Sequence, residues 1–479
     1  MNRIRKNNSF FILVLTVTVT FIFIGFNINI QAEEVSLEEA LSWGIEHNSS
    51  IKEIKDSIET IERSLNLIDT EYGFKTNISA DPIIAGSSDV EIDGGGDNLG
   101  SSSPKITLKT TKLFPNGIIL QSEISLKEEG WFDLEKLSEG PDSTFSAAKS
   151  LYPILPIESE QKKYLASNNL LKVKENLTWQ QENKKIEFLE SYFNLLRLQE
   201  RLSLTKTNFQ YAQDDLNKIL KKIEIGEAGE RQEIEAKITL KKAEINFLQT
   251  QNTFLQQKNR WYLDLNLSEG VEVSLREDSP FLEETKKWVE SLELNLEEQE
   301  KLMELVVVSH YQIKNNQLDL DSSQKELEWN LVKNKPQISL YGTYDYQSST
   351  STWGVGIDLS YNIFDGGKQK LENEEYQAKL TNLEDDYLQI VAELKWELNN
   401  LINQYTVCSL NLEEKLMSYQ KSKLEEESYR AQLQQGLISD SGFQYKMLGW
   451  QESEINLKSA KDEILINKLR MAHFLGFRK

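Results

Sequence analysis

Titratable side chains are numerous in this sequence, but their spacing does not assemble a catalytic site. The only cysteine is Cys408, which excludes a disulfide within the chain and a cysteine metal cluster. Carboxylate pairs such as Glu38-Glu39 are adjacent, and adjacent residues on a helix do not face each other, so they make poor acid–base pairs. The three histidines are far apart in the sequence: His47, His310 and His473. We therefore predict a protein without enzymatic activity, metal or cofactor, in which His47 and His310 are surface residues.

The elements that carry these side chains are predicted to be long. The 479 residues include 8 prolines and 23 glycines, which is too few for a string of loop-rich domains. Residues 1–32 have the layout of a signal peptide, with three basic residues, an apolar run over 10–26 and a polar end. We expect the protein to be exported, with an uncleaved N-terminal anchor as the alternative.

The chain is strongly acidic. Its net charge is -22, and removal of the predicted signal, which carries three positive charges and no negative charge, makes it about -25. This charge argues against nucleic acid and anionic lipid as partners, because both repel acidic surfaces.

Two parts of the chain follow the same plan. Residues 151–155 resemble residues 360–364 at an offset of 209, and Gly226 matches Gly436 at an offset of 210. Each half reads as helix, strands, long helix, turn and helix. We therefore predict an internal duplication, with residues 33–279 as the first structural repeat and residues 280–479 as the second.

The first repeat contains an insertion. Residues 49–52 match residues 311–314 at an offset of 262, which leaves about 53 extra residues between roughly 80 and 150. Within this region, residues 105–113 and 118–126 flank a Pro-Asn-Gly turn and predict a hairpin. The sequence leaves open whether this hairpin joins the other strands, forms an external loop or packs elsewhere.

The long helices have a coiled-coil pattern. No proline or glycine interrupts the chain between Gly367 and Gly436, and apolar residues recur there every seven positions. The two predicted seams are Leu380, Tyr387, Leu394, Leu401 and Cys408 in the second half, and Phe188, Leu195, Leu202, Phe209, Leu216 and Ile223 in the first. Helices of about 65 to 70 residues are about 100 Å long, which exceeds the size of a globular domain.

Residues 337–363 predict a transmembrane β-hairpin, because apolar and small polar residues alternate in it. The face predicted to contact lipid contains Trp353, Val355, Ile357, Leu359 and Tyr361, with Ile338 and Leu340 from the preceding strand. The face predicted to contact water contains Asp358, Ser360 and Asn362. A spanning strand needs about 9 to 11 residues of this pattern.

One chain offers too few strands to close a barrel. About four to six strands are fewer than the eight of the smallest barrels, and an open edge in lipid leaves backbone groups unpaired. The fold class is therefore an α+β membrane protein, in which an antiparallel coiled-coil helical barrel continues into strands that contribute to a shared trimeric β-barrel. If the inserted hairpin stays outside, three copies with about four strands each make about twelve strands.

Four motifs follow one another along the chain: residues 36–41 (SLEEAL), 361–367 (YNIFDGG), 435–439 (QGLIS) and 474–476 (FLG). Their order resembles that of the TolC family of outer membrane efflux and secretion channels. The resemblance covers essentially the whole mature chain. It implies a homotrimer in outer membrane lipid, a tunnel through the periplasm, a periplasmic adaptor protein and an inner-membrane pump of the RND, ABC or MFS type.

The resemblance also implies that Gly226 and Gly436 mark the periplasmic tip of the tunnel. In the family an acidic residue often follows the second glycine by six positions, but here that position is Gly442 and the acid is Asp440. Asp440 is a candidate gate residue, with a solvated turn residue or a helix N-cap as the alternative. The other candidate entrance acids are Glu227, Glu230 and Glu233.

The function predicted from these features is a passive conduit in a tripartite efflux or type I secretion system. The alternative is an exported coiled-coil scaffold or surface adhesin without a pore. The two hypotheses differ over the strands, because a scaffold has no need for one apolar and one polar face along residues 353–363.

Overall fold

The computed structural model describes residues 33–81, 105–127, 141–267, 271–292, 296, 298–347 and 350–477. The predicted signal peptide, at residues 1–32, lies outside the described residues, and so do the parts of the insertion at 82–104 and 128–140. Among the described residues, no helix combines the length and the apolarity that a membrane crossing requires.

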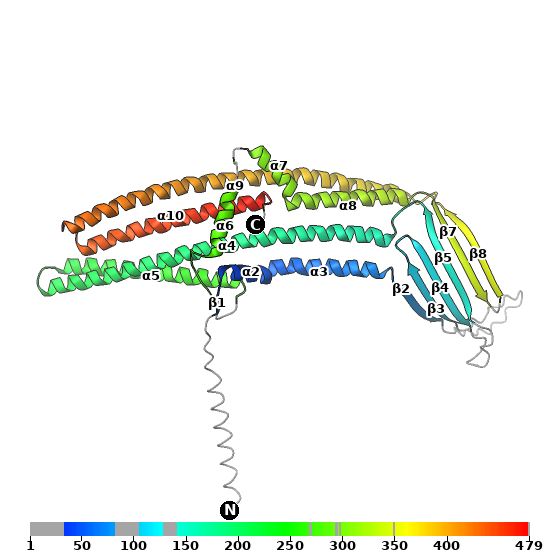
Figure 1. Ribbon diagram of the computed structural model, residues 1–479, viewed down its shortest axis with the longest axis horizontal. Helices are drawn as coiled ribbons and strands as arrows, with labels where there is room; N and C mark the ends of the chain where they lie inside the picture. Colours follow the sequence, from blue (N-terminus) through cyan, green and yellow to red (C-terminus); the bar gives the residue numbers. More distant parts are fainter. Residues whose placement is uncertain are drawn as a thin grey trace, which may run out of the picture.

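Long helices connect a β-sheet at one end of the molecule with two helical turns at the other (Figure 1). Four helices adjoin the sheet: α3 (Ser49–Thr70), α4 (Glu158–Glu224), α8 (Tyr311–Lys333) and α9 (Lys368–Gln434). Two more return from the far turns: α5 (Glu230–Asp264) and α10 (Asp440–Phe474). The chain therefore forms two long antiparallel hairpins, α4–α5 and α9–α10.

The two longest helices agree with the prediction from sequence. Helices α4 and α9 each contain 67 residues, and at 1.5 Å per residue each is about 100 Å long. Every residue of the two predicted heptad seams is buried or half-buried. The seams thus hold each helix against its neighbours, as the seven-residue spacing requires.

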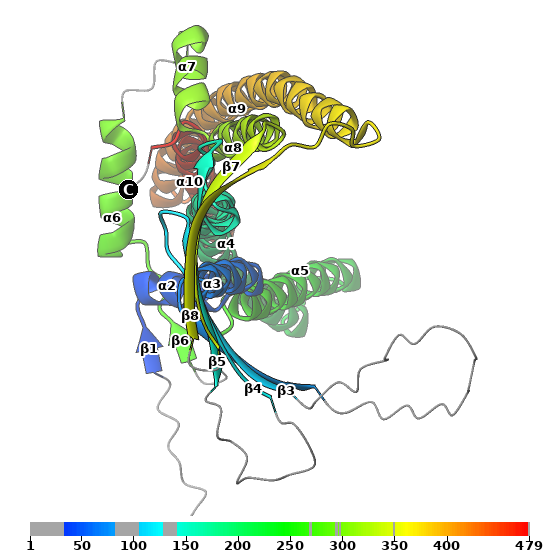
Figure 2. The ribbon, with the colours of Figure 1, turned by 90° about the vertical axis from the view of Figure 1, so that its right-hand side faces the viewer.

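The sheet is antiparallel and contains six strands. They are β2 (Phe74–Asp81), β3 (Lys105–Leu113), β4 (Ile118–Lys127), β5 (Asp142–Tyr152), β7 (Gln337–Gln347) and β8 (Thr350–Ser360). Their order in the sheet is β2-β3-β4-β5-β7-β8, and Figure 2 shows them as one curved layer at the end of the helices. The inserted hairpin β3–β4 therefore lies inside the sheet, between β2 and β5. The chain has six strands in this sheet, the upper end of the predicted range of four to six.

Short elements surround the middle of the long helices. They are β1 (Glu33–Val35), α2 (Leu37–His47), β6 (Val271–Val273), α6 (Pro280–Ser291) and α7 (Gln299–Ser309). Strands β1 and β6 pair in parallel. Both hydrophobic cores are located here: one contains Leu41, Tyr192 and Trp261, and the other contains Val306, Leu398 and Phe474.

Matching elements of the two halves have nearly equal lengths. Helices α2 and α7 have 11 residues each, α3 and α8 have 22 and 23, and α5 and α10 have 35 each. The N-caps of α3 and α8, Asn48 and His310, are separated by the offset of 262 found in the sequence. The element lengths thus match between the halves, while the duplication itself and its boundary near residue 280 stay predictions.

Candidate pore wall, tunnel entrance and central ion cluster

One face of the sheet is apolar across all six strands. The pairing register aligns Ile78 with Leu108, Leu108 with Ile124, and Leu340 with Ile357. On this face Trp353 is 78% exposed, and Val355, Ile357 and Leu359 are 68–69% exposed. Further exposed apolar side chains on it are Phe74, Ile78, Ile106, Leu120, Leu126, Phe145, Leu340, Tyr344 and Tyr346. An apolar surface of this extent needs an apolar partner.

Among the polar side chains on the apolar face, Thr76 and Thr110 are paired and Lys112 lies near the border. The hydroxyls of Thr76 and Thr110, on adjacent strands, are 3.1 Å apart and hydrogen-bonded to each other. Lys112 lies near the helical end of the sheet, where its Nζ donates to the carbonyl of Tyr72 and lies 4.9 Å from the ring centre of Phe74. A lysine at the border of an apolar surface can keep its ammonium group in a polar layer.

The opposite face is polar over most of its area. Its side chains include Lys75, Asn77, Ser79, Thr107, Lys109, Thr111, Gln121, Glu123, Ser125, Thr144, Ser146, Thr343, Asp345 and Asp358. The Thr144 hydroxyl donates to Asp345 Oδ1 at 2.7 Å. The exceptions are Leu113 and Ile119, beside the β3–β4 turn, and Tyr341 on β7. This face is suited to water, whereas the first is not.

The hairpin β7–β8 differs from the prediction at one end. Ile338, Leu340, Trp353, Val355, Ile357 and Leu359 share the apolar face, with Asp358 and Ser360 opposite. Strand β8, however, begins at Thr350 and ends at Ser360, so the assignment of Tyr361 and Asn362 to it is wrong. The last pair joins Gln337 and Ser360, so that Tyr361 would face Pro336, which has no N–H to continue the ladder.

Gly226 lies in the α4–α5 turn and Gly436 in the α9–α10 turn, and these two turns are the ones farthest from the sheet (Figure 1). Gly226 has φ 78° and Gly436 has φ 71°, in the left-handed region that favours glycine. Gly436 N donates to Leu433 O, and Leu437 N donates to Gln432 O; matching bonds occur at Gly226. This is the Schellman pattern that ends a helix. A Cβ at either glycine would have no heavy atom within 4 Å, so the backbone conformation alone requires glycine.

The candidate entrance acids have different surroundings. Ser439, not Asp440, is the N-cap of α10, because its hydroxyl accepts from Gly442 N at 3.1 Å. The N-cap alternative for Asp440 is therefore wrong, and Asp440 is an exposed first-turn residue. Glu227 and Glu230 are also exposed, whereas Glu233 forms a 2.6 Å ion pair with Lys237.

Exposed apolar side chains stand beside both tip glycines. Ile225 and Leu437 are each 69% exposed. Ile234 and Ile238, one turn apart on α5, are 49% and 50% exposed. The end of the molecule opposite the sheet thus combines acidic and apolar groups.

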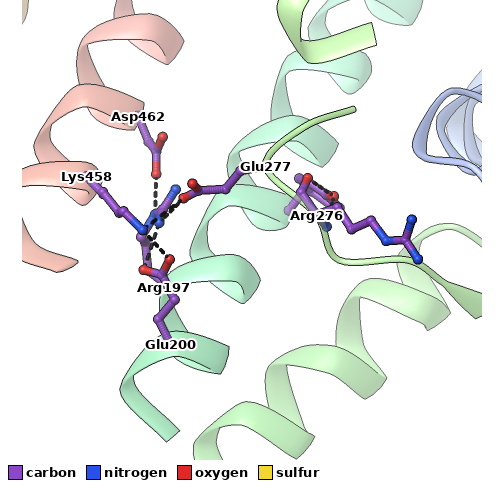
Figure 3. Close-up of polar contacts among 7 residues, drawn as sticks. Arg197, Glu200, Arg276, Glu277, Lys458 and Asp462 are labelled. Atoms are coloured by element: carbon purple, nitrogen blue, oxygen red, sulfur yellow. Dashed lines mark hydrogen bonds and ion pairs between the residues drawn. The ribbon is translucent and has the colours of Figure 1, made fainter. Parts of the chain in front are cut away.

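An ion cluster around the buried Arg197 joins helices α4 and α10 to the segment between β6 and α6 (Figure 3). Arg197 on α4 is 7% exposed. Its Nε donates to Asp462 on α10 at 2.7 Å, and one of its terminal nitrogens donates to Glu200 at 2.8 Å. The same guanidinium contacts Glu277, in the segment between β6 and α6. Lys458 adds a 2.7 Å bond to Glu200.

The cluster changes the ionisation of its members. Burial raises the pKa of Asp462 to about 6, and the ion pair with Arg197 limits the rise. Burial also opposes the ionised form of Glu277, but the hydrogen bonds and charge attraction of Arg197 and Lys458 together outweigh it and lower the pKa of Glu277. Removal of Arg197 would leave carboxylates without their main counter-ion in a partly buried site.

A second central contact involves His310 and His473. The prediction that His310 is a surface residue is wrong, because it is 2% exposed; His473 is 9% exposed. The Trp179 ring centre lies 4.3 Å from that of His310 and 3.9 Å from that of His473. Burial lowers the pKa of His310 to about 4. Cys408, on the heptad seam, has a pKa raised by burial, which fits an inert thiol.

Solved structures of outer membrane channels share this architecture. CusC, studied during transmembrane channel formation, aligns with 92% of this chain and 91% of its own, with TM-score 0.61 and 12% identity. The Campylobacter jejuni CmeC outer membrane channel aligns with 92% of this chain and 85% of its own, with TM-score 0.60 and 11% identity. The open Neisseria gonorrhoeae MtrE outer membrane channel aligns with 92% of this chain and 89% of its own, with TM-score 0.58 and 12% identity.

No protein-family model matches the sequence, and neither does any curated protein. The coarse fold prediction, long antiparallel helices joined to an antiparallel sheet, is confirmed. At these identities the likeness concerns the fold: the chain has the fold of outer membrane channels, the kind of protein that its sequence motifs resemble.

Proposed function

We propose that the protein is the subunit of an outer membrane channel of the TolC type, a passive conduit without enzymatic activity or cofactor. The observation that carries this proposal is the sheet, whose apolar face is exposed and whose other face is polar. The apolar face, including Trp353, Val355, Ile357 and Leu359, contacts outer membrane lipid, while Asp358 and Ser360 face the lumen. A scaffold or adhesin would leave the apolar face in water, at a large cost in hydration free energy.

The long helices form a tunnel through the periplasm. Helix α9 has three buried residues within one chain, Leu394, Leu398 and Ile402. Other apolar residues on it remain uncovered, with Leu371, Leu388, Val407 and Leu424 each 66–67% exposed. Contacts with neighbouring copies would bury these side chains and stabilise the tunnel. We assign the assembly as a homotrimer, which the resemblance to the TolC family implies.

The helical turns form the tunnel entrance. Their exposed Ile225 and Leu437 supply an apolar docking surface for a periplasmic adaptor protein, and an inner-membrane pump of the RND, ABC or MFS type supplies the energy. Symmetry brings copies of Asp440, Glu227 and Glu230 near one another, which favours cations at the entrance. Glu233 contributes less, because Lys237 neutralises it. The system would be a tripartite efflux or type I secretion machine.

The test is purification of the mature chain in detergent, followed by measurement of its oligomeric mass and of single-channel conductance in a planar bilayer. We expect a trimer with discrete conductance steps. A monomer without conductance would refute the channel. Asp440→Asn should reduce cation selectivity if Asp440 lines the entrance, and Glu233→Gln, at the ion-paired position, is the matched control.

A further inference from the structure

The strands outnumber the helices to which they are attached. Strand β2 follows α3, β5 leads into α4, β7 follows α8 and β8 leads into α9. The helices pack in the order α3, α4, α8, α9, which is also the order of their strands in the sheet (Figure 1). The hairpin β3–β4 is attached to no helix, yet it lies between β2 and β5. The insertion therefore adds two strands to the sheet without adding a helix to the tunnel.

The added hairpin continues both faces of the sheet without a break. Ile106 and Leu108 pair with Leu126 and Ile124 on the apolar face, and Lys109 pairs with Glu123 on the polar face. The ladders β2–β3, β3–β4 and β4–β5 contain no register shift. A hairpin lying outside the wall would have no reason to align its apolar residues with those of its neighbours.

The added width fits the helices. Strands about 4.8 Å apart and tilted by about 40° are spaced about 6.3 Å along a barrel circumference, so six cover about 38 Å and four cover about 25 Å. Four helices packed at about 9 Å cover about 36 Å. At this tilt, six strands therefore match the arc of the four helices.

We propose that β3–β4 is part of the membrane wall and that three copies close a barrel of eighteen strands, by pairing β2 of one copy with β8 of the next. Among the described residues, β2 pairs only with β3 and β8 only with β7. An even number of antiparallel strands makes the two edges antiparallel to each other, so the same ladder pattern continues between copies. The backbone diameter is about 36 Å, against about 24 Å for twelve strands. This inference rests on the proposed channel function.

Two cysteine pairs that share Ser146 test the position of the hairpin. Gln121 on β4 is the direct partner of Ser146 on β5, whereas Lys75 on β2 lies in the same row, three strands away. Three strand spacings are about 14 Å, which is too far for a disulfide. Both pairs are introduced on Cys408→Ala, which removes the only native cysteine, and disulfides are measured by mass spectrometry in the purified oligomer.

We expect Gln121→Cys/Ser146→Cys to be oxidised in most chains and Lys75→Cys/Ser146→Cys to stay at background. The reverse result would mean that the hairpin leaves the wall and β2 pairs with β5, and it would overturn the proposal, as would the absence of both disulfides.

Cryo-electron microscopy of the full chain in lipid nanodiscs then counts the strands. Eighteen strands in a trimer support the proposal. A conducting oligomer with twelve strands, whether a trimer or a dimer, overturns the proposal but leaves the channel function intact. A monomer without conductance overturns both.

Discussion

Replacement of Val355 by arginine would test which face of the sheet contacts lipid. Strand β8 has 11 residues, so at about 3.3 Å per residue and a tilt of about 40° it spans about 28 Å, close to the apolar band of an outer membrane. Val355 is the central residue of β8 and is 69% exposed on the apolar face. Its side chain therefore lies near the midplane, where an arginine costs about 2 to 4 kcal/mol.

This cost is repeated in every copy of the chain. The three arginines of a trimer would together destabilise the inserted barrel by about 6 to 12 kcal/mol, which is a large fraction of the free energy of unfolding of most proteins. We expect Val355→Arg to reduce assembled trimer in the outer membrane fraction at least tenfold, as measured by semi-native gel electrophoresis. Thr343→Arg is the matched control, because Thr343 pairs with Gly354 beside the same depth but on the polar face.

The two variants separate a lipid effect from general damage to the strand. If Val355→Arg assembles like the wild type while Thr343→Arg fails, the assignment of the faces is reversed. If both assemble normally, the sheet does not span a membrane. A urea titration of each variant refolded into lipid would give the free energy difference directly.

Three further predictions concern the ion cluster, His310 and the turns. Arg197→Met should lower the free energy of unfolding by about 3 to 5 kcal/mol, because it leaves carboxylates without a counter-ion. The melting temperature of this variant, measured by circular dichroism, should therefore lie well below that of the exposed control Arg201→Met. Equal melting temperatures would contradict the role of the cluster. His310 has a lowered folded pKa of about 4, so the unfolded chain binds its proton first, and stability should fall by up to about 3 kcal/mol as pH drops from about 6.5 to 4. His310→Asn retains a capping side chain and should lack this component; an unchanged pH profile would refute it. Gly436→Ala should destabilise by about 1 kcal/mol because of its positive φ, whereas Gly449→Ala, inside α10, should stabilise by about 0.5 to 1 kcal/mol; the same sign for both would be inconsistent with the turn geometry.

Local patterns in the sequence were sufficient to predict the long helices and the hairpins β3–β4 and β7–β8, but they gave no bounds for β2 and β5. The absence of glycine and proline and the seven-residue spacing predicted α9 to within a few residues, and the Pro-Asn-Gly turn predicted both strands of the inserted hairpin. The end of β8 was predicted wrongly. Pro336 limits the length of the partner strand β7, but it shows where β8 ends only when the pairing register of the two strands is known.

Contacts between distant segments could not be predicted. Arg197 and Asp462 are 265 positions apart, and charged pairs at helical spacing are so common in this chain that none identifies the cluster. His310 seemed to lie on a polar helix, but Trp179 and His473 bury it from two other segments. The place of β3–β4 in the sheet likewise depends on partners that local pattern does not specify.

Both hydrophobic cores lie at mid-length, far from the turns at the ends of the helical hairpins. In α9 the last buried residue is Ile402, and the helix continues to Gln434, about 48 Å farther; over this length the α9–α10 hairpin still packs on α4, for example through Tyr211 and Tyr445. A rotation of the hairpin together with α4 by about 10° about the core would move the turn by about 8 Å. Large displacements at the far end are thus mechanically compatible with a core that stays intact.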